Sequence, residues 1–188
     1  MKGIIFSNFL EMVAEVFSPE MVETIIEQSN LSTQGAYTDI GTYDHQELLR
    51  LIKNLSLAIK IPISQLQIEY GKYLFNKFLN RYKDLIQTAN STFKFLQQVD
   101  NHIHVEVRKL YPEAELPRFE CNMLNDHVMT MKYSSNHPFA DLAEGLILGC
   151  SRYFKENIQL TRQELKPEID KKYVMLFTLE KRINCAKD

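Results

Sequence analysis

The stretch Asp100-Asn-His-Ile-His-Val-Glu-Val-Arg-Lys-Leu-Tyr-Pro112 is decisive for the fold, because it places two histidines on one short helix. Apolar residues recur along it at helical spacing and predict a face packed against a core: Ile103, Val107 and Leu110. His104 falls at the edge of this apolar face, and His102 falls roughly on the far side. An imidazole beside an apolar wall can bind a metal-containing cofactor, although a partly buried structural histidine gives the same pattern.

The sequence before this stretch predicts a series of helices. Ser18 and Asp44 read as N-caps, Pro62 breaks a helix, and Ser64 reads as the cap of the next one. Apolar spacing places the helices at 3–17, 19–28, 44–59, 64–78, 82–89 and 91–98, with a polar loop over 30–43.

After Pro117 the pattern changes to strands. Alternation and a turn at Asn125-Asp126 predict strands at 118–125 and 127–135, then an apolar helix at 139–154 and strands at 156–164 and 172–182. The predicted fold class is α+β, with a helical N-terminal half and a mostly antiparallel four-stranded sheet. We expect one domain over 1–188, divided into a helical part at about 1–62 and an α+β part at about 63–188.

Composition sets the class of protein. The chain has 188 residues, 45% hydrophobic and 11% aromatic, which suits one domain large enough to enclose a cofactor. A net charge of -2 without clusters of Lys and Arg argues against nucleic-acid binding, and the absence of a long apolar run argues against a membrane span, so we expect a cytoplasmic protein. Cys121, Cys150 and Cys185 are too far apart for a covalent haem motif, and they make a disulfide framework or a structural zinc site improbable.

Several segments together resemble one family. These are Met1-Lys-Gly-Ile-Ile-Phe6, Gly35-Ala-Tyr-Thr38, Tyr70-Gly-Lys-Tyr-Leu-Phe75, His104 seven residues before Tyr111-Pro112, and Tyr133-Ser-Ser135, which begins 29 residues after His104. In order and spacing the chain resembles the haem-nitric oxide/oxygen-binding (H-NOX) family, which includes the sensor domain of soluble guanylate cyclase. The resemblance implies a b-type haem with His104 as the axial iron ligand, and His102 is the competing choice.

The resemblance also implies a site for the haem propionates. Tyr133 and Ser135 match the Tyr and the Ser of a Tyr-x-Ser-x-Arg motif, and His137 stands where the family has Arg. An imidazole carries charge only when protonated, so we expect a looser and pH-sensitive grip. The N-terminus of the helix after Pro138 could compensate. Pro117 and Ile5 match residues that press on the porphyrin.

The distal residues implied by the resemblance predict gas selectivity. Leu142 stands where oxygen-binding relatives have a hydrogen-bonding tyrosine, and Phe9 and Leu74 stand at positions that support it. With Phe78 they form an apolar pocket without a donor, which predicts binding of nitric oxide and carbon monoxide but no stable oxygen complex.

The predicted function is a cytoplasmic nitric oxide sensor and not an enzyme, because the sequence offers no phosphate loop or catalytic arrangement. Nitric oxide would release His104 from the iron and let the 101–110 helix shift. The resemblance implies a separate histidine kinase or cyclic-di-GMP enzyme as the partner. Two alternatives are a haem-free adaptor and a haem enzyme of peroxidase type.

Overall fold

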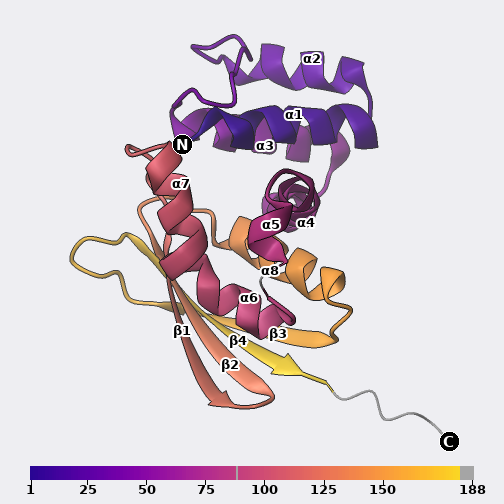
Figure 1. Cartoon of the computed structure of the whole chain (residues 1–188). Helices are drawn as coiled ribbons and strands as arrows, with labels where there is room; N and C mark the ends of the chain where they lie inside the picture. The colour runs from indigo at the N-terminus through magenta and orange to yellow at the C-terminus, as the bar shows by residue number, and fades with distance from the viewer. Residues whose placement is uncertain (88, 183–188) are drawn as a thin grey trace, which may run out of the picture.

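The N-terminal part is a stack of three helices, α1 (Gly3–Val16), α2 (Pro19–Ser29) and α3 (His45–Ile59), seen at the top of Figure 1. The computed structural model describes residues 1–87 and 89–182. The caps predicted from sequence are confirmed, since Ser18 Oγ accepts a hydrogen bond from Met21 N at 3.2 Å and Asp44 Oδ1 accepts one from Gln46 N at 3.0 Å. These helices bury their apolar faces against one another.

One buried carboxylate fixes the loop between α2 and α3. Glu47 is 1% exposed and accepts hydrogen bonds from Ser32 N at 2.9 Å, Thr33 Oγ1 at 2.7 Å and the Tyr37 hydroxyl at 2.7 Å. Burial alone would raise the pKa of Glu47, but the hydrogen bonds from these three residues lower it to about 2. The carboxylate therefore stays ionised and holds the loop against α3.

Helices α4 (Ile63–Arg81) and α8 (Ala140–Tyr153) cross in the middle of the molecule with their backbones in contact. A Cβ at Gly71 would collide with Leu142 O, and one at Gly145 would collide with Ile68 O, so only glycine allows this approach. The prediction that Ser64 caps α4 is wrong: the helix begins one residue earlier, after Pro62, whose fixed φ suits the position before a helix.

The C-terminal half contains a four-stranded antiparallel sheet in the order β1-β2-β4-β3. The strands are β1 (Arg118–Asn125), β2 (Val128–Ser135), β3 (Ile158–Leu165) and β4 (Tyr173–Lys181). On β2, alternate side chains Met129, Met131 and Tyr133 are buried, as the period of two requires. The predicted α+β class and the four strands are confirmed.

A series of short helices runs along the edge of the sheet toward the N-terminus (Figure 1). The short α5 (Lys83–Ile86) and α6 (Thr92–Gln98) come first, and the rod that follows consists of a π-helix η1 (Val99–Ile103) and α7 (His104–Leu110). The prediction that Leu110 packs inside is wrong. Leu110 is 65% exposed, because the last turn of α7 extends past the sheet. Ile103 and Val107 remain half-buried.

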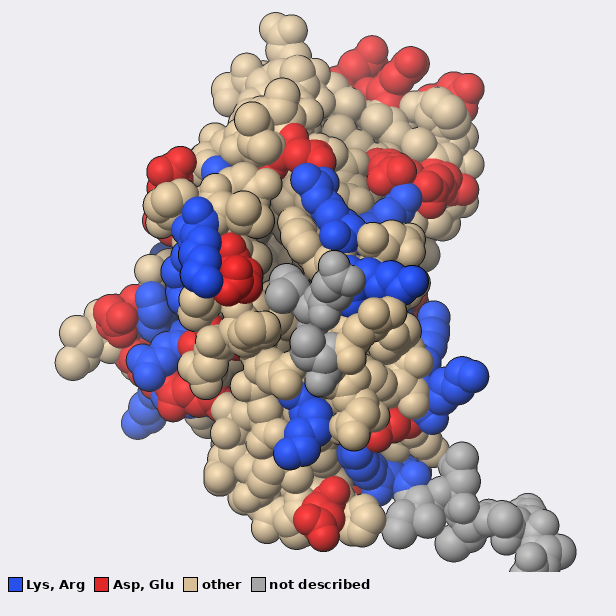
Figure 2. Space-filling view, viewed as in Figure 1, with Lys and Arg blue, Asp and Glu red and all other residues tan. Residues whose placement is uncertain are grey.

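The apolar side chains form two cores. One joins α1–α3 to one side of α4, and the other joins the sheet to α6 and α8, while Leu146 of α8 contacts both. Figure 2 shows Lys and Arg interspersed with Asp and Glu over the face in view. Among the described residues, no helix has both the length and the apolar character needed to cross a bilayer.

Candidate cofactor site

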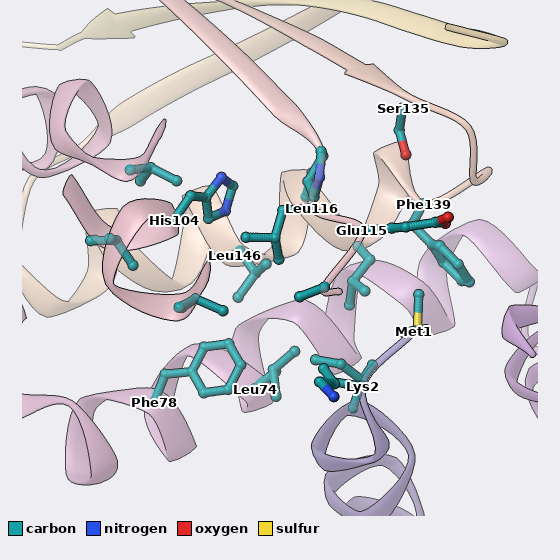
Figure 3. A pocket seen from close by; sticks show the side chains of 18 of the residues that line it. Met1, Lys2, Leu74, Phe78, His104, Glu115, Leu116, Ser135, Phe139 and Leu146 are labelled. Atoms are coloured by element: carbon teal, nitrogen blue, oxygen red, sulfur yellow. The ribbon is translucent and has the colours of Figure 1, made fainter. Parts of the chain in front are cut away.

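A cavity of about 510 Å³ lies between the two cores. Its walls come from the start of α1, from α4, from η1 and α7, from β1 and β2, and from α8. This volume is within the range of about 300–1,000 Å³ that is usual for small-molecule and cofactor sites. Figure 3 shows His104 at one end of the cavity and Ser135 and Glu115 at the other, with apolar side chains between them.

His104 is the polar group that enters the apolar end. Its side chain is 12% exposed, and its Nδ1 lies 3.3 Å from Asp100 Oδ1. Burial lowers the pKa of His104, and the Asp100 carboxylate opposes this shift without cancelling it. When Nδ1–H of a neutral imidazole donates to a carboxylate, Nε2 is unprotonated and keeps a free lone pair. A histidine in this tautomer can bind a metal through Nε2.

The structure separates the two candidate histidines. His104 is the first residue of α7 and lies against the Phe119 ring, with centroids 5.7 Å apart. His102 is exposed and is not part of the cavity wall. The π-helix just before His104 adds a residue to one turn, and such turns are frequent at functional sites.

The predicted propionate residues meet at the other end of the cavity. The Tyr133 hydroxyl donates to His137 O at 3.0 Å, and His137 N donates to Ser135 Oγ at 3.0 Å, so the end of β2 is tied to the turn that follows it. Burial raises the pKa of Tyr133 to about 12, which keeps its hydroxyl protonated as a donor. Helix α8 begins two residues after Pro138, at Ala140.

The wall between these ends is apolar. Five of the predicted residues contribute to it: Ile5, Leu74, Phe78, Pro117 and Leu142. Phe9 does not reach the cavity. It is fully buried behind the wall, one turn further along α1 than Ile5, with its ring edge-on to Tyr70 at 5.2 Å.

One tyrosine beside this wall is engaged elsewhere, since Tyr70 is fully buried and donates to Ile5 O. Tyr82 also borders the cavity, and burial raises its pKa. The wall residues Leu74, Phe78, Leu142 and Leu146 have hydrocarbon side chains and offer no hydrogen-bond donor.

Sequence reasoning missed several residues of the site. Asp100 could have been found, because a carboxylate four residues before a histidine lies on the same helix face. His45, Glu115 and Met1 also border the cavity, but they come from distant segments, and nothing in their local sequence indicates that they meet there.

The residues present fit a b-type haem. The cavity has a neutral imidazole on an apolar side for the iron and hydroxyl and imidazole groups at the mouth for the carboxylates. The described residues hold no group of three or more His, Cys, Asp or Glu suited to a bare metal ion. Cys121 and Cys150 are free thiols, and Cys185 lies outside the described residues.

Comparisons with known proteins agree with this geometry. A family model described as Haem-NO-binding matches residues 2–162. The structure is similar to the Fe(II) unliganded H-NOX protein from K. algicida, with 36% identity, full coverage of both chains and a TM-score of 0.89. It is also similar to an H-NOX protein from Shewanella woodyi in the Fe(II)CO state, with 36% identity, coverage of 100% of this chain and 98% of the other, and a TM-score of 0.82.

The chain therefore belongs to the H-NOX family of haem-binding gas-sensor domains, which are not themselves enzymes. A more distant similarity is to soluble guanylate cyclase gcy-35 of Caenorhabditis elegans, with 23% identity over 175 residues. That match covers 89% of this chain but 25% of the cyclase, so the chain spans about a quarter of the length of that relative.

Proposed function

We propose that this protein is a haem-based sensor that binds nitric oxide, and also carbon monoxide, but forms no stable complex with oxygen. The observation that carries the proposal is the place of His104 at one end of a cavity whose wall includes Leu74, Phe78 and Leu142, where burial lowers the pKa of the imidazole. When bound, haem b supplies a ferrous iron with one coordination position open to a diatomic gas. A stable oxygen complex needs a hydrogen-bond donor at that position, and Leu142 offers none.

The chain's own residues divide the work of holding the cofactor. His104 Nε2 would bind the iron, and Asp100 would fix the ring orientation through Nδ1. Tyr133, Ser135 and His137 would bind the carboxylates at the mouth, while Ile5 and Pro117 would press on the porphyrin from the wall. The apolar wall excludes water from the gas-binding side.

The helical rod at 99–110 is the element that would transmit the signal. It buries none of its residues, and Asp100 ties it to β1 through a 3.4 Å hydrogen bond from Phe119 N. If His104 held the iron, its release would leave this segment connected to the interior by Asp100 and the half-buried side chains alone. We expect it to shift relative to the helical part at about 1–62, within a single domain whose α+β part spans about 63–188.

For the recipient of the signal we propose a histidine kinase or a cyclic-di-GMP enzyme in the cytoplasm. The support is the family resemblance and the lack of a phosphate-binding or catalytic motif in the sequence. A candidate kinase should change its autophosphorylation rate when the ferrous protein is converted to its nitric oxide form. Equal rates with both forms would exclude that kinase.

The central experiment compares two histidines on the same helix. His104→Gly should lose the native ferrous spectrum and regain five-coordinate character on addition of imidazole, whereas His102→Ala, at the exposed position, should match the parent. Ferrous parent protein in air should form no oxygen adduct, and nitric oxide should give a five-coordinate spectrum. An unchanged spectrum in His104→Gly without imidazole contradicts the proposal.

The gas selectivity is tested at Leu142. Leu142→Tyr places a hydroxyl on the apolar wall and should slow oxygen dissociation enough to make an oxygen complex visible in air. Leu142→Phe is the matched control, because it adds a ring without a donor and should not do so. Oxygen binding by the control or by the parent would show that Leu142 does not set the selectivity.

The same preparations separate the two alternatives. A protein that stays colourless when haem is added would favour a haem-free adaptor. Turnover of peroxide with a reducing substrate would favour a haem enzyme, which normally needs a polar distal group where this wall has Leu74, Phe78 and Leu142.

A further inference from the structure

Two histidines from opposite halves of the protein meet at the mouth of the cavity. His45 is the first residue of α3, and His137 lies between β2 and α8. Their ring centroids are 4.1 Å apart, with an interplanar angle of 42°, and both residues border the cavity. Phe139 flanks them, with its centroid 6.3 Å from His45 and 6.5 Å from His137.

The hydrogen bonds of His137 determine which of its nitrogens carries a proton. Nε2 lies 2.9 Å from Glu115 Oε2, and a carboxylate only accepts, so Nε2 is the protonated nitrogen of the neutral ring. Nδ1 is buried and has no hydrogen-bond partner among the described residues. A buried polar atom without a partner points to a group that the site receives from outside the chain.

His45 differs, since both of its ring nitrogens lie near polar atoms. Nδ1 is 3.3 Å from Asp44 Oδ1, and Nε2 is hydrogen-bonded to the Gln46 side-chain amide nitrogen at 3.1 Å. Burial lowers the pKa of His45, and charge on His137 lowers it further. The two rings therefore do not carry charge together, and a neutral His45 face lies against the His137 ring.

The other charged groups at the mouth nearly balance. The Met1 ammonium donates to Tyr43 O at 2.8 Å, and Lys2 borders the cavity beside it. Asp44, Glu113 and Glu115 supply three negative charges, and Glu115 is 73% exposed. Burial lowers the pKa of the Met1 ammonium, so the Met1 amine can also lose its charge as pH rises, and the variants at His137 isolate the contribution of that ring.

We propose that His137 binds a carboxylate of the cofactor through Nδ1 only when its imidazole is protonated, with neutral His45 packed on the imidazolium. This inference rests on the proposed function, because the carboxylates are those of haem. Binding takes up one proton from solvent, which goes onto Nδ1. The new Nδ1–H donates to the carboxylate, and Nε2–H continues to donate to Glu115. An arginine at this position would need no proton.

The sign of the pH dependence follows from linkage. Carboxylate binding favours the protonated ring. The hydrogen bond from Nδ1–H to the carboxylate is therefore present at low pH, and it is lost as pH rises and the imidazole loses its proton. A charge-assisted hydrogen bond is roughly twice as strong as a neutral one. Its loss should speed release of haem by about tenfold.

The test measures haem release at pH 6 and pH 9, by transfer from the CO-bound ferrous protein to excess apomyoglobin. The parent should release haem about tenfold faster at pH 9. His137→Arg should release it slowly, and His137→Gln quickly, with little dependence on pH in either variant. His127→Gln, which changes an exposed histidine in the hairpin turn, is the matched control and should behave as the parent does.

The role of His45 has its own variants. His45→Phe keeps an apolar ring on His137 and should preserve the pH profile. His45→Lys places a permanent cation there and should move the profile to lower pH, since both groups then compete for charge. In the CO-bound ferrous protein, the ¹⁵N shifts of the His137 ring should be those of an imidazolium at neutral pH.

The outcomes are separable from those of the proposed function. Failure to take up haem at all would overturn both. Haem bound through His104 with a release rate that is flat between pH 6 and pH 9, or unchanged in His137→Gln, would overturn this inference alone. Far-UV circular dichroism identifies any variant that has failed to fold, and the ¹⁵N measurement on the parent then still decides the question.

Discussion

Helix α3 and the rod at 99–110 are both close to the cavity, yet they are anchored in different ways. Helix α3 buries Leu48, Leu51, Ile52 and Leu55 and holds the preceding loop through Glu47. The rod, formed by η1 and α7, has no fully buried residue. Its ties to the rest of the protein include the half-buried Val99, Ile103 and Val107, the contact of His104 with the Phe119 ring, and the Asp100 side chain.

This difference shows how a single bond, from His104 to a bound iron, could fix the position of the rod at 99–110. A segment with few buried contacts opens or shifts at low cost in free energy, whereas a segment in the core moves only when the core does. If His104 binds the iron, the rod is held mainly from inside the cavity. The N-terminal helices then provide a fixed wall against which the rod can move.

The sharpest test of this comparison is a pair of leucine truncations. Leu51→Ala should lower the free energy of unfolding by about 2–5 kcal/mol, because it leaves a cavity in the N-terminal core. Leu110→Ala, on the exposed side of α7, should change it by less than about 0.5 kcal/mol. Urea denaturation of both variants measures this. Equal losses would mean that α7 is as firmly packed as α3.

A second test uses pH on the N-terminal side. The pKa of Glu47 is about 2 in the folded protein, against an ordinary value of 4.5. Its folded pKa is depressed, so its contribution is complete above about pH 4.5 and is lost as pH falls toward 2. The contribution is roughly 3 kcal/mol.

Unfolding should therefore be compared at pH 6 and pH 3 in two variants. Glu47→Gln should be less stable than the parent at pH 6 and should lose less on acidification. Glu27→Gln, an exposed change on α2, should follow the parent at both pH values. A Glu47→Gln protein with the parent's acid sensitivity would show that other carboxylates control the acid transition.

A third test acts on the rod itself. Asp100→Ala removes the partner of His104 Nδ1 and the tie to Phe119 N, and it should weaken haem affinity by roughly tenfold, or about 1.4 kcal/mol. The iron–histidine stretching frequency should fall as well, which a purely structural role would not require. Asn101→Ala, on the exposed next residue, is the control. An unchanged frequency in Asp100→Ala would mean that the carboxylate does not position the ring.

Much of this comparison could be predicted from sequence. Helical spacing and the caps at Ser18 and Asp44 located α1 to α3, and strict alternation located β2. Such signals are local, so each can be recognised without knowledge of the rest of the fold. The prediction at Leu110 failed because apolar spacing shows which face of a helix is apolar but not where the core ends.

The composition of the cavity depends on contacts that no local pattern encodes. Phe9 and Ile5 lie on the same helix, and only the packing of Tyr70 shows that Phe9 is set behind the wall. His45 and His137 come from segments separated by more than 90 residues, and their contact depends on how the two halves close. The resemblance to the family thus indicates the proposed iron ligand His104 more readily than local patterns indicate the groups at the mouth.

The smallest expected effect concerns the surface of α7. Lys109 Nζ lies 2.7 Å from Glu106 Oε1, one turn earlier on the same helix, and the Lys109 side chain is 65% exposed. Exposed pairs of this kind add little, because solvent screens the charges and both side chains lose freedom. Lys109→Ala should therefore leave the urea midpoint unchanged within error, at both low and high salt. A salt-dependent loss of stability would mean that electrostatics at the surface, and not the cavity side, anchors α7, and the contrast with α3 would then need a different explanation.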